Sequence, residues 1–134
     1  MVASPSEKTA LPQIGAVKHP RLETALESAD GDWLCAGCLN RIASEEDRFQ
    51  YDGKSEFSFS NPDGLQFDII TFSQAVGGQE VGTPTLEHTW FSEHAWSFCV
   101  CDRCQTHLGW FYSGPQEFVG LIRNRLVRGR SIWN

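Results

Sequence analysis

The sequence lacks a long apolar run and is poor in positive charge. No stretch reaches the roughly 18 consecutive apolar residues that a membrane-spanning helix needs, so we expect no membrane partner. The 134 residues contain 11 Lys and Arg against 17 Asp and Glu, a formal net charge of −6. A chain with this charge repels phosphate backbones, so we expect no nucleic-acid partner. Residues 1–15 contain no apolar segment typical of a secretory signal, which predicts a cytoplasmic location.

The basic residues cluster late in the chain, as Arg123, Arg125, Arg128 and Arg130. RNA binding is one interpretation, but we favour the solvated face of an amphipathic helix. Pro115 suits the first turn of such a helix and Gly129 can end it. Its apolar stripe would comprise Phe118, Leu121, Ile122 and Leu126. The sequence therefore predicts a short C-terminal helix.

The rest of the chain predicts a single, mainly β domain. Residues 1–29 are rich in Ser, Pro, Ala and Lys, which predicts a flexible tail, with a short helix at 21–29 that is too short to be stable alone. Alternation in 56–60, a turn at 61–64 and a second apolar run at 65–72 predict a hairpin. The Gly-rich stretch 74–85 predicts a loop, and strands are expected near 95–102 and 106–114. We expect the folded domain to span 30–130.

Four of the five cysteines form two CxxC pairs, Cys35 with Cys38 and Cys101 with Cys104. Each pair can turn tightly and direct two sulfurs at one point, and two pairs complete a tetrahedral thiolate site typical of structural zinc. Iron binds the same four ligands, so spacing leaves the metal open. A redox CxxC pair is the other interpretation, but it needs a βαβ context that the sequence does not show. We predict one structural Zn²⁺.

Two further residues lie close to the second pair. Cys99 is expected on the same strand as Cys101, either as a small buried apolar residue, which we favour, or as a reactive thiol. His107 has ligand-like spacing from Cys104. Since four thiolates already complete the site, we interpret His107 as a residue outside the metal's ligand set.

Three of the five tryptophans flank the second cysteine pair, as Trp90, Trp96 and Trp110. Tyr112 lies two residues after Trp110, so both point to the same side of a strand. These aromatic residues could simply be core. A polar loop separates Trp90 from Trp96, however, and this favours an aromatic cage. Such a cage can hold a cation or a compact saturated ring with a polar edge.

The segments EHTWF, AWSF, CxxC and HLGWFY, with Asn61-Pro62 before them and FVGLIRNRL after them, resemble the thalidomide-binding (CULT) domain of the cereblon family. The resemblance covers about residues 30–128 and is greatest for small stand-alone bacterial cereblon-like proteins. It implies a β-tent, in which two antiparallel sheets meet at an angle and are pinned near the zinc. It also implies a binding module rather than an enzyme.

The family's guests are glutarimides such as thalidomide, cyclic-imide protein ends and uridine-like rings. The resemblance implies that Trp90, Trp96 and Trp110 form the walls of the cage and that Tyr112 closes it. Backbone groups of His88 and Trp90 would bond the imide edge. The remaining rim positions would be Asn61, Pro62, Phe67 and Glu87.

Two other functions remain open. Methionine sulfoxide reductases of one class look similar in fold and carry the same cysteine pairs, so Cys99 with His88 and His94 is the alternative catalytic set. A module that reads methylated ammonium groups would use the same aromatic cage. We favour the imide-binding module, since its motif contains no nucleophile–base pair.

Overall fold

The computed structural model describes residues 31–129. The predicted tail and the predicted helix at 21–29 lie outside these residues. Within them the chain forms nine strands and two 3-10 turns, with no longer helix. The elements are β1 (Asp32–Cys35), β2 (Arg41–Ser44), η2 (Glu45–Asp47), β3 (Glu56–Ser60), β4 (Gln66–Phe72), β5 (Gly78–Thr85), β6 (Ala95–Cys101), β7 (His107–Ser113), β8 (Glu117–Ile122), η3 (Arg123–Arg125) and β9 (Leu126–Arg128).

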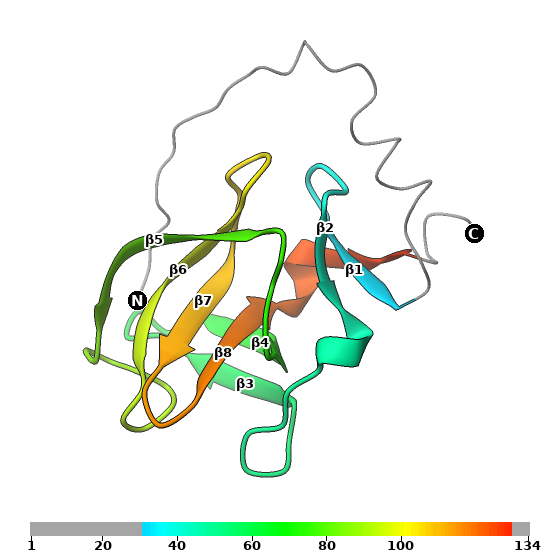
Figure 1. Cartoon of the computed structure of the whole chain (residues 1–134). Helices are drawn as coiled ribbons and strands as arrows, with labels where there is room; N and C mark the ends of the chain where they lie inside the picture. The colour runs from blue at the N-terminus through cyan, green and yellow to red at the C-terminus, as the bar shows by residue number, and fades with distance from the viewer. Residues whose placement is uncertain (1–30, 130–134) are drawn as a thin grey trace.

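The strands form two antiparallel sheets, which confirms the predicted fold class. The smaller sheet has the order β2-β1-β9 and the larger has the order β3-β4-β8-β7-β6-β5. In Figure 1 the β1–β2 pair stands beside the curved larger sheet, and its turn lies next to the β6–β7 turn. Both turns carry a CxxC pair. The two sheets therefore come together at the cysteines.

Alternation along the central strands creates two separate cores. Cys99, Ile70, Val119 and Leu121 point toward the smaller sheet and belong to one apolar cluster with Trp33. The residues between them in the sequence point the other way and form a second cluster that is largely aromatic: Trp96, Phe98, Trp110, Tyr112, Phe118, Phe57, Phe59 and Phe67, among others. The larger sheet thus has a metal side and an aromatic side.

The predicted hairpin at 56–72 is confirmed. β3 pairs with β4 in register from Glu56↔Ile70 to Ser60↔Gln66. The Asn61 side chain organises the turn, because its Oδ1 accepts from the backbone N–H of Asp63 at 3.0 Å and of Leu65 at 2.9 Å. The predicted strands near 95–102 and 106–114 are confirmed as β6 and β7.

The loop predicted at 74–85 is wrong for residues 78–85, which form β5. This edge strand pairs with β6 from Gly78↔Cys101 to Thr85↔Trp96, with an irregularity after Val81. Gly82 in that irregularity has a positive φ of 92°, a conformation that favours glycine. Gly and Pro are tolerated in an edge strand, so the composition that suggested a loop is compatible with pairing.

The predicted C-terminal helix is also wrong. Residues 117–122 form β8, and 118–122 are all buried. A strand that is covered on both faces has a continuous apolar run, which also satisfies a helical stripe. Gly120 fits this strand because a Cβ there would lie 2.9 Å from Cγ2 of Ile69.

Arg123, Arg125 and Arg128 therefore do not lie along the predicted amphipathic helix, and Arg130 lies outside the described residues. Arg125 donates to the His107 carbonyl at 2.9 Å and lies over the Phe67 ring. The Arg128 guanidinium lies 4.9 Å from the centre of the Trp33 ring. These side chains pack against the domain rather than form a free basic surface.

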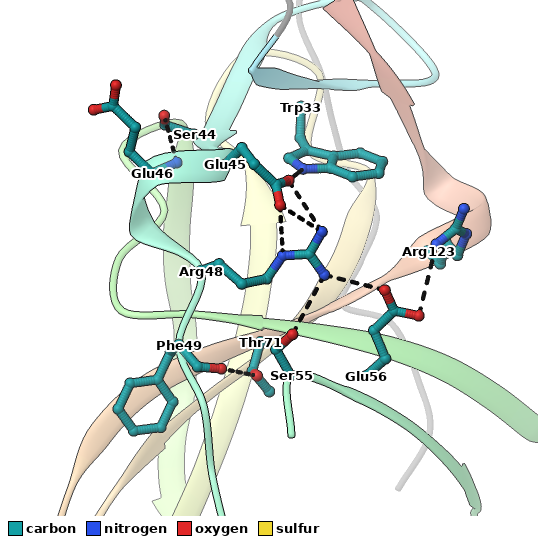
Figure 2. Close-up of polar contacts among 10 residues, drawn as sticks. All are labelled: Trp33, Ser44, Glu45, Glu46, Arg48, Phe49, Ser55, Glu56, Thr71 and Arg123. Carbon is teal, nitrogen blue, oxygen red and sulfur yellow. Dashed lines mark hydrogen bonds and ion pairs between the residues drawn. The ribbon is translucent and has the colours of Figure 1, made fainter. Parts of the chain in front are cut away.

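A polar network joins the two sheets near η2 (Figure 2). Arg48 bonds Glu45 at 2.7 Å and Glu56 of β3 at 3.2 Å, while Trp33 of β1 donates to Glu45 at 2.8 Å. Burial opposes ionisation of Glu45, but the hydrogen bonds from Trp33 and Arg48 outweigh it and lower the pKa of this carboxyl. The network fixes the smaller sheet against the edge of the larger one.

None of the helical segments in the described part of the chain is long and apolar enough to cross a membrane.

Candidate zinc site and aromatic site

The two CxxC turns have the same backbone geometry. The N–H of Leu39 donates to the Cys35 carbonyl at 2.7 Å, and that of Gln105 donates to the Cys101 carbonyl at 2.8 Å. Leu39 and Gln105 both have positive φ values, 65° and 67°. Each turn therefore reverses the chain immediately after its second cysteine and holds two sulfurs on one side.

The four sulfurs of Cys35, Cys38, Cys101 and Cys104 lie within 4.8 Å of one another. Cys35 and Cys104 are 3.6 Å apart, as are Cys38 and Cys101. A tetrahedron with Zn–S bonds of about 2.3 Å has edges of about 3.8 Å, so the cluster fits one zinc ion. The predicted ligands and cofactor are confirmed, and the four cysteines are positioned to bind one Zn²⁺ with no position left for a substrate.

Hydrogen bonds from neighbouring thiols favour negative charge on one of these sulfurs, that of Cys101. Bonds first from Cys35 and then from Cys38 lower the pKa of the Cys101 thiol, and the bond to Cys101 raises the pKa of the Cys35 thiol. Backbone N–H groups of Gly37 and Arg103 also donate to sulfur, at 3.3 and 3.4 Å. A bound divalent cation would favour the thiolate at every position.

Cys99 and His107 lie outside the ligand set. Cys99 is fully buried, and burial raises the pKa of its thiol, which fits the apolar role that we favoured over a reactive one. His107 Nε2 bonds the Gly109 carbonyl at 2.9 Å, and its ring packs edge-on against Trp110 at 5.0 Å. His107 therefore connects the metal turn to the aromatic side.

The aromatic side brings Trp90 and Trp110 into contact, with ring centres 5.0 Å apart and planes at 78°. Phe67 lies against both rings, at 6.0 and 5.4 Å. Phe59 stacks on Trp90 at 4.9 Å and 15°. Sequence reasoning placed Phe59 in the hairpin but not at the site. The only signal was that Phe57 and Phe59 alternate on the same face as Phe67.

Trp96 and Tyr112 are near this cluster but have other ring partners. Trp96 contacts Phe98 at 5.2 Å, and its Nε1 donates to the Glu87 carbonyl at 2.8 Å. Tyr112 contacts Phe91 at 4.8 Å. Trp110 Nε1 and the Tyr112 hydroxyl are buried donors that have no partner among residues 31–129. The three-walled cage closed by Tyr112 stays a prediction.

The predicted rim residues differ in exposure. Asn61 is buried in its turn, while Pro62 is exposed. The side chains of Glu87 and His88 are 75% and 56% exposed. His88 has a positive φ of 58°. The backbone groups of His88 and Trp90 form no hydrogen bond within the described chain.

Two surface hollows lie away from the tryptophans. One of about 510 Å³ is lined by residues of β3 and β4 with Arg123. The other, of about 560 Å³, lies beside Gly78 and Phe111 and reaches Tyr112. Because Trp90 and Trp110 are in contact, a guest between them would require their rings to move apart.

The amino-acid sequence is similar to those of cereblons from three vertebrates. The chain is 32% identical to cereblon of Danio rerio over 120 residues, which cover 84% of the chain and 28% of that protein. It is 30% identical to cereblon of Xenopus tropicalis over 123 residues, 85% of the chain and 28% of that protein. A match to cereblon of Gallus gallus is 33% identical over 76 residues, 52% of the chain and 17% of that protein. The chain belongs to the cereblon family.

This membership agrees with the CULT-domain motifs and with the cysteine cluster. The chain spans about 28% of the length of the longer-matching cereblons, so the similarity concerns one part of those proteins. All three relatives are vertebrate proteins, and the greater likeness to bacterial cereblon-like proteins stays a prediction. No protein-family model matches the chain.

Proposed function

We propose that residues 30–130 form a binding module for cyclic imides, and that the module performs no chemistry of its own. The guest is a glutarimide ring of the thalidomide type, a uridine-like ring or a cyclic-imide protein end. Trp90, Trp96 and Trp110 form the walls of the site. Zinc is structural.

The observation that carries this proposal is the pairing of an aromatic cluster with unused backbone groups. An imide edge presents a carbonyl, an N–H and a second carbonyl, so it needs an acceptor between two donors. The backbone groups of His88 and Trp90 form no hydrogen bond within residues 31–129 and belong to the same loop as the Trp90 ring. Each amide–imide bond contributes about 1 kcal/mol net. The buried, unpartnered Trp110 Nε1 is a further donor for a guest carbonyl.

The buried thiol of Cys99 supports a non-enzymatic role. A sulfoxide reductase needs an exposed cysteine with a lowered pKa, whereas Cys99 is 0% exposed and burial raises its pKa. Cys99 belongs to the buried apolar cluster that also contains Cys35, Cys38 and Cys101. We also propose a cytoplasmic location, because a reducing compartment keeps five cysteines available as thiols and metal ligands.

Isothermal titration calorimetry with glutarimide tests the proposal. We expect the wild type to bind glutarimide but not N-methylglutarimide, which lacks the N–H. Trp96→Ala should lose binding, whereas Leu86→Ala, which removes a side chain that is 60% exposed in the same loop, should retain it. Equal responses of wild type and Trp96→Ala would disprove the cage.

Competition distinguishes the other aromatic-cage function. A quaternary ammonium ion should be tested for displacement of bound glutarimide. If the ion displaces glutarimide and binds more tightly than glutarimide does, the site recognises cations by their attraction to the ring faces. Thiol-dependent turnover of a methionine sulfoxide that disappears in Cys99→Ser would show instead that the domain is an enzyme.

A further inference from the structure

Residues 86–94, which we call the tryptophan loop, carry Trp90 and lead into Trp96. The loop is held together around the backbone of His94. The Thr89 hydroxyl donates to the His94 carbonyl at 2.6 Å and to the Phe91 carbonyl at 3.3 Å. The His94 N–H donates to the Phe91 carbonyl at 3.0 Å. Trp90 therefore lies between Thr89 and Phe91, and each of these two residues forms a hydrogen bond with the backbone of His94.

The His94 side chain attaches this loop to the turn between β7 and β8. Its Nδ1 contacts the Ser92 carbonyl at 2.8 Å, and its Nε2 lies 3.2 Å from the backbone N of Gln116. Gly114 of that turn packs directly beneath the loop, because a Cβ there would lie 2.4 Å from the Glu93 carbonyl oxygen. The imidazole therefore connects the tryptophan loop to the β7–β8 turn, and the backbones of these two segments are in close contact.

These two partners determine the protonation of the ring. A carbonyl oxygen can only accept, so Nδ1 must carry the proton. A backbone N–H can only donate, so Nε2 must be unprotonated. Both bonds exist together only in the neutral imidazole with its proton on Nδ1.

The surroundings offer no compensation for a second proton. His94 is 2% exposed. Tyr51 and Phe118 present aromatic rings to it at 5.6 and 5.4 Å. Glu93 and Glu117 are the neighbouring carboxyls along the two contacting segments, and neither is among the ion pairs of residues 31–129. A proton on Nε2 would remove the bond from Gln116 and leave a buried, unpaired charge.

We propose that His94 is a positioning residue for the ligand site and that it holds the tryptophan loop only as the neutral imidazole. This inference rests on the proposed function. Protonation of Nε2 would release the loop from the β7–β8 turn and displace Trp90 and the backbone groups beside it. Binding of a cyclic imide should consequently weaken when acid protonates this ring.

The test is a calorimetric titration with glutarimide at pH 7.5 and pH 5.5. We expect wild-type affinity to be lower at pH 5.5 than at pH 7.5, and a tenfold fall would correspond to about 1.4 kcal/mol. His94→Gln keeps a side-chain acceptor for Gln116 but does not titrate, so its affinity should be the same at both pH values. Leu86→Ala changes a side chain of the same loop that is 60% exposed, and the ratio of its two affinities should match that of the wild type.

The variants also separate this effect from metal loss. Loss of zinc in acid would weaken binding in His94→Gln as much as in the wild type. Equal affinities of the wild type at the two pH values, or an equal fall in His94→Gln, would overturn the proposal. If the wild type does not bind glutarimide at pH 7.5, the proposed function fails.

Nitrogen NMR of the imidazole gives an independent result that needs no ligand. At pH 7.5 the ring of His94 should show the tautomer with its proton on Nδ1, and the Gln116 amide should be protected from exchange. On acidification the exchange protection of Gln116 and of the loop amides should fall together. A ring with its proton on Nε2, or Gln116 protection that is unchanged when the ring is protonated, would contradict the inference.

Discussion

Removal of zinc should destabilise the domain and, through the fold, abolish ligand binding. The ion would join Cys38 to Cys101 and so close a loop of roughly 60 residues. By the chain-entropy relation used for cross-links, such a closure is worth about 4 kcal/mol. A small domain has a total unfolding free energy of about 5–15 kcal/mol. With a urea m-value of about 2 kcal/mol/M, we expect the unfolding midpoint to fall by about 2 M.

Circular dichroism in urea, with and without a zinc chelator and with a thiol reductant present, measures this shift. A chromophoric zinc reporter should find one ion for each chain. Cys104→Ser should reproduce the effect of the chelator. Cys99→Ser is the matched control, because its sulfur is outside the cluster, and its chelator-induced shift should equal that of the wild type. Unchanged midpoints after complete zinc removal, or normal glutarimide binding by the metal-free chain, would refute the role of the metal as a clasp between the sheets.

Three further predictions concern single side chains. Asn61→Ala should lower the unfolding free energy by about 2 kcal/mol, since two turn N–H groups lose their acceptor, whereas Asn61→Asp keeps an acceptor; equal losses in urea denaturation would contradict this. Burial, and then the charge of Arg125, lower the pKa of His107 to about 4. An unfolded histidine titrates near 6.5, so below that pH the unfolded chain binds more protons and stability should fall by about 2 kcal/mol from pH 7 to pH 5; His107→Gln should show a smaller fall, and an identical fall would be evidence against this cause. Cys99→Ser should leave glutarimide affinity unchanged while costing about 1–3 kcal/mol of stability through its buried hydroxyl, and a loss of affinity without a loss of stability would assign Cys99 to the site.

The parts of the fold that sequence could predict are those encoded by short spacing. Two CxxC pairs specify a metal cluster because each turn is formed within a few residues. The period of two in 95–101 and 107–113 predicts strands because it fits no helix. The hairpin at 56–72 could be predicted from the turn chemistry of Asn61 and Gly64.

The failures arise where tertiary contacts decide the structure. Residues 117–122 are apolar because both faces of β8 are covered, and such a run does not distinguish a strand from a buried helix. β5 contains Gly82 and Pro84, and only its pairing with β6 makes it a strand. Phe59 was not assigned to the aromatic site because its stacking on Trp90 depends on a loop some 30 residues away in the sequence.

The division of β6 and β7 into a metal side and an aromatic side has a consequence for how these strands can change during evolution. Successive residues serve opposite faces, so insertion or deletion of one residue within either strand would exchange the faces beyond that point. An insertion early in β6 would move Cys99 out of its core, and one early in β7 would move Trp110 out of its core. The cysteine turn between the strands cannot absorb the change either, because its spacing holds the sulfurs. β6 and β7 should therefore keep their lengths among related chains.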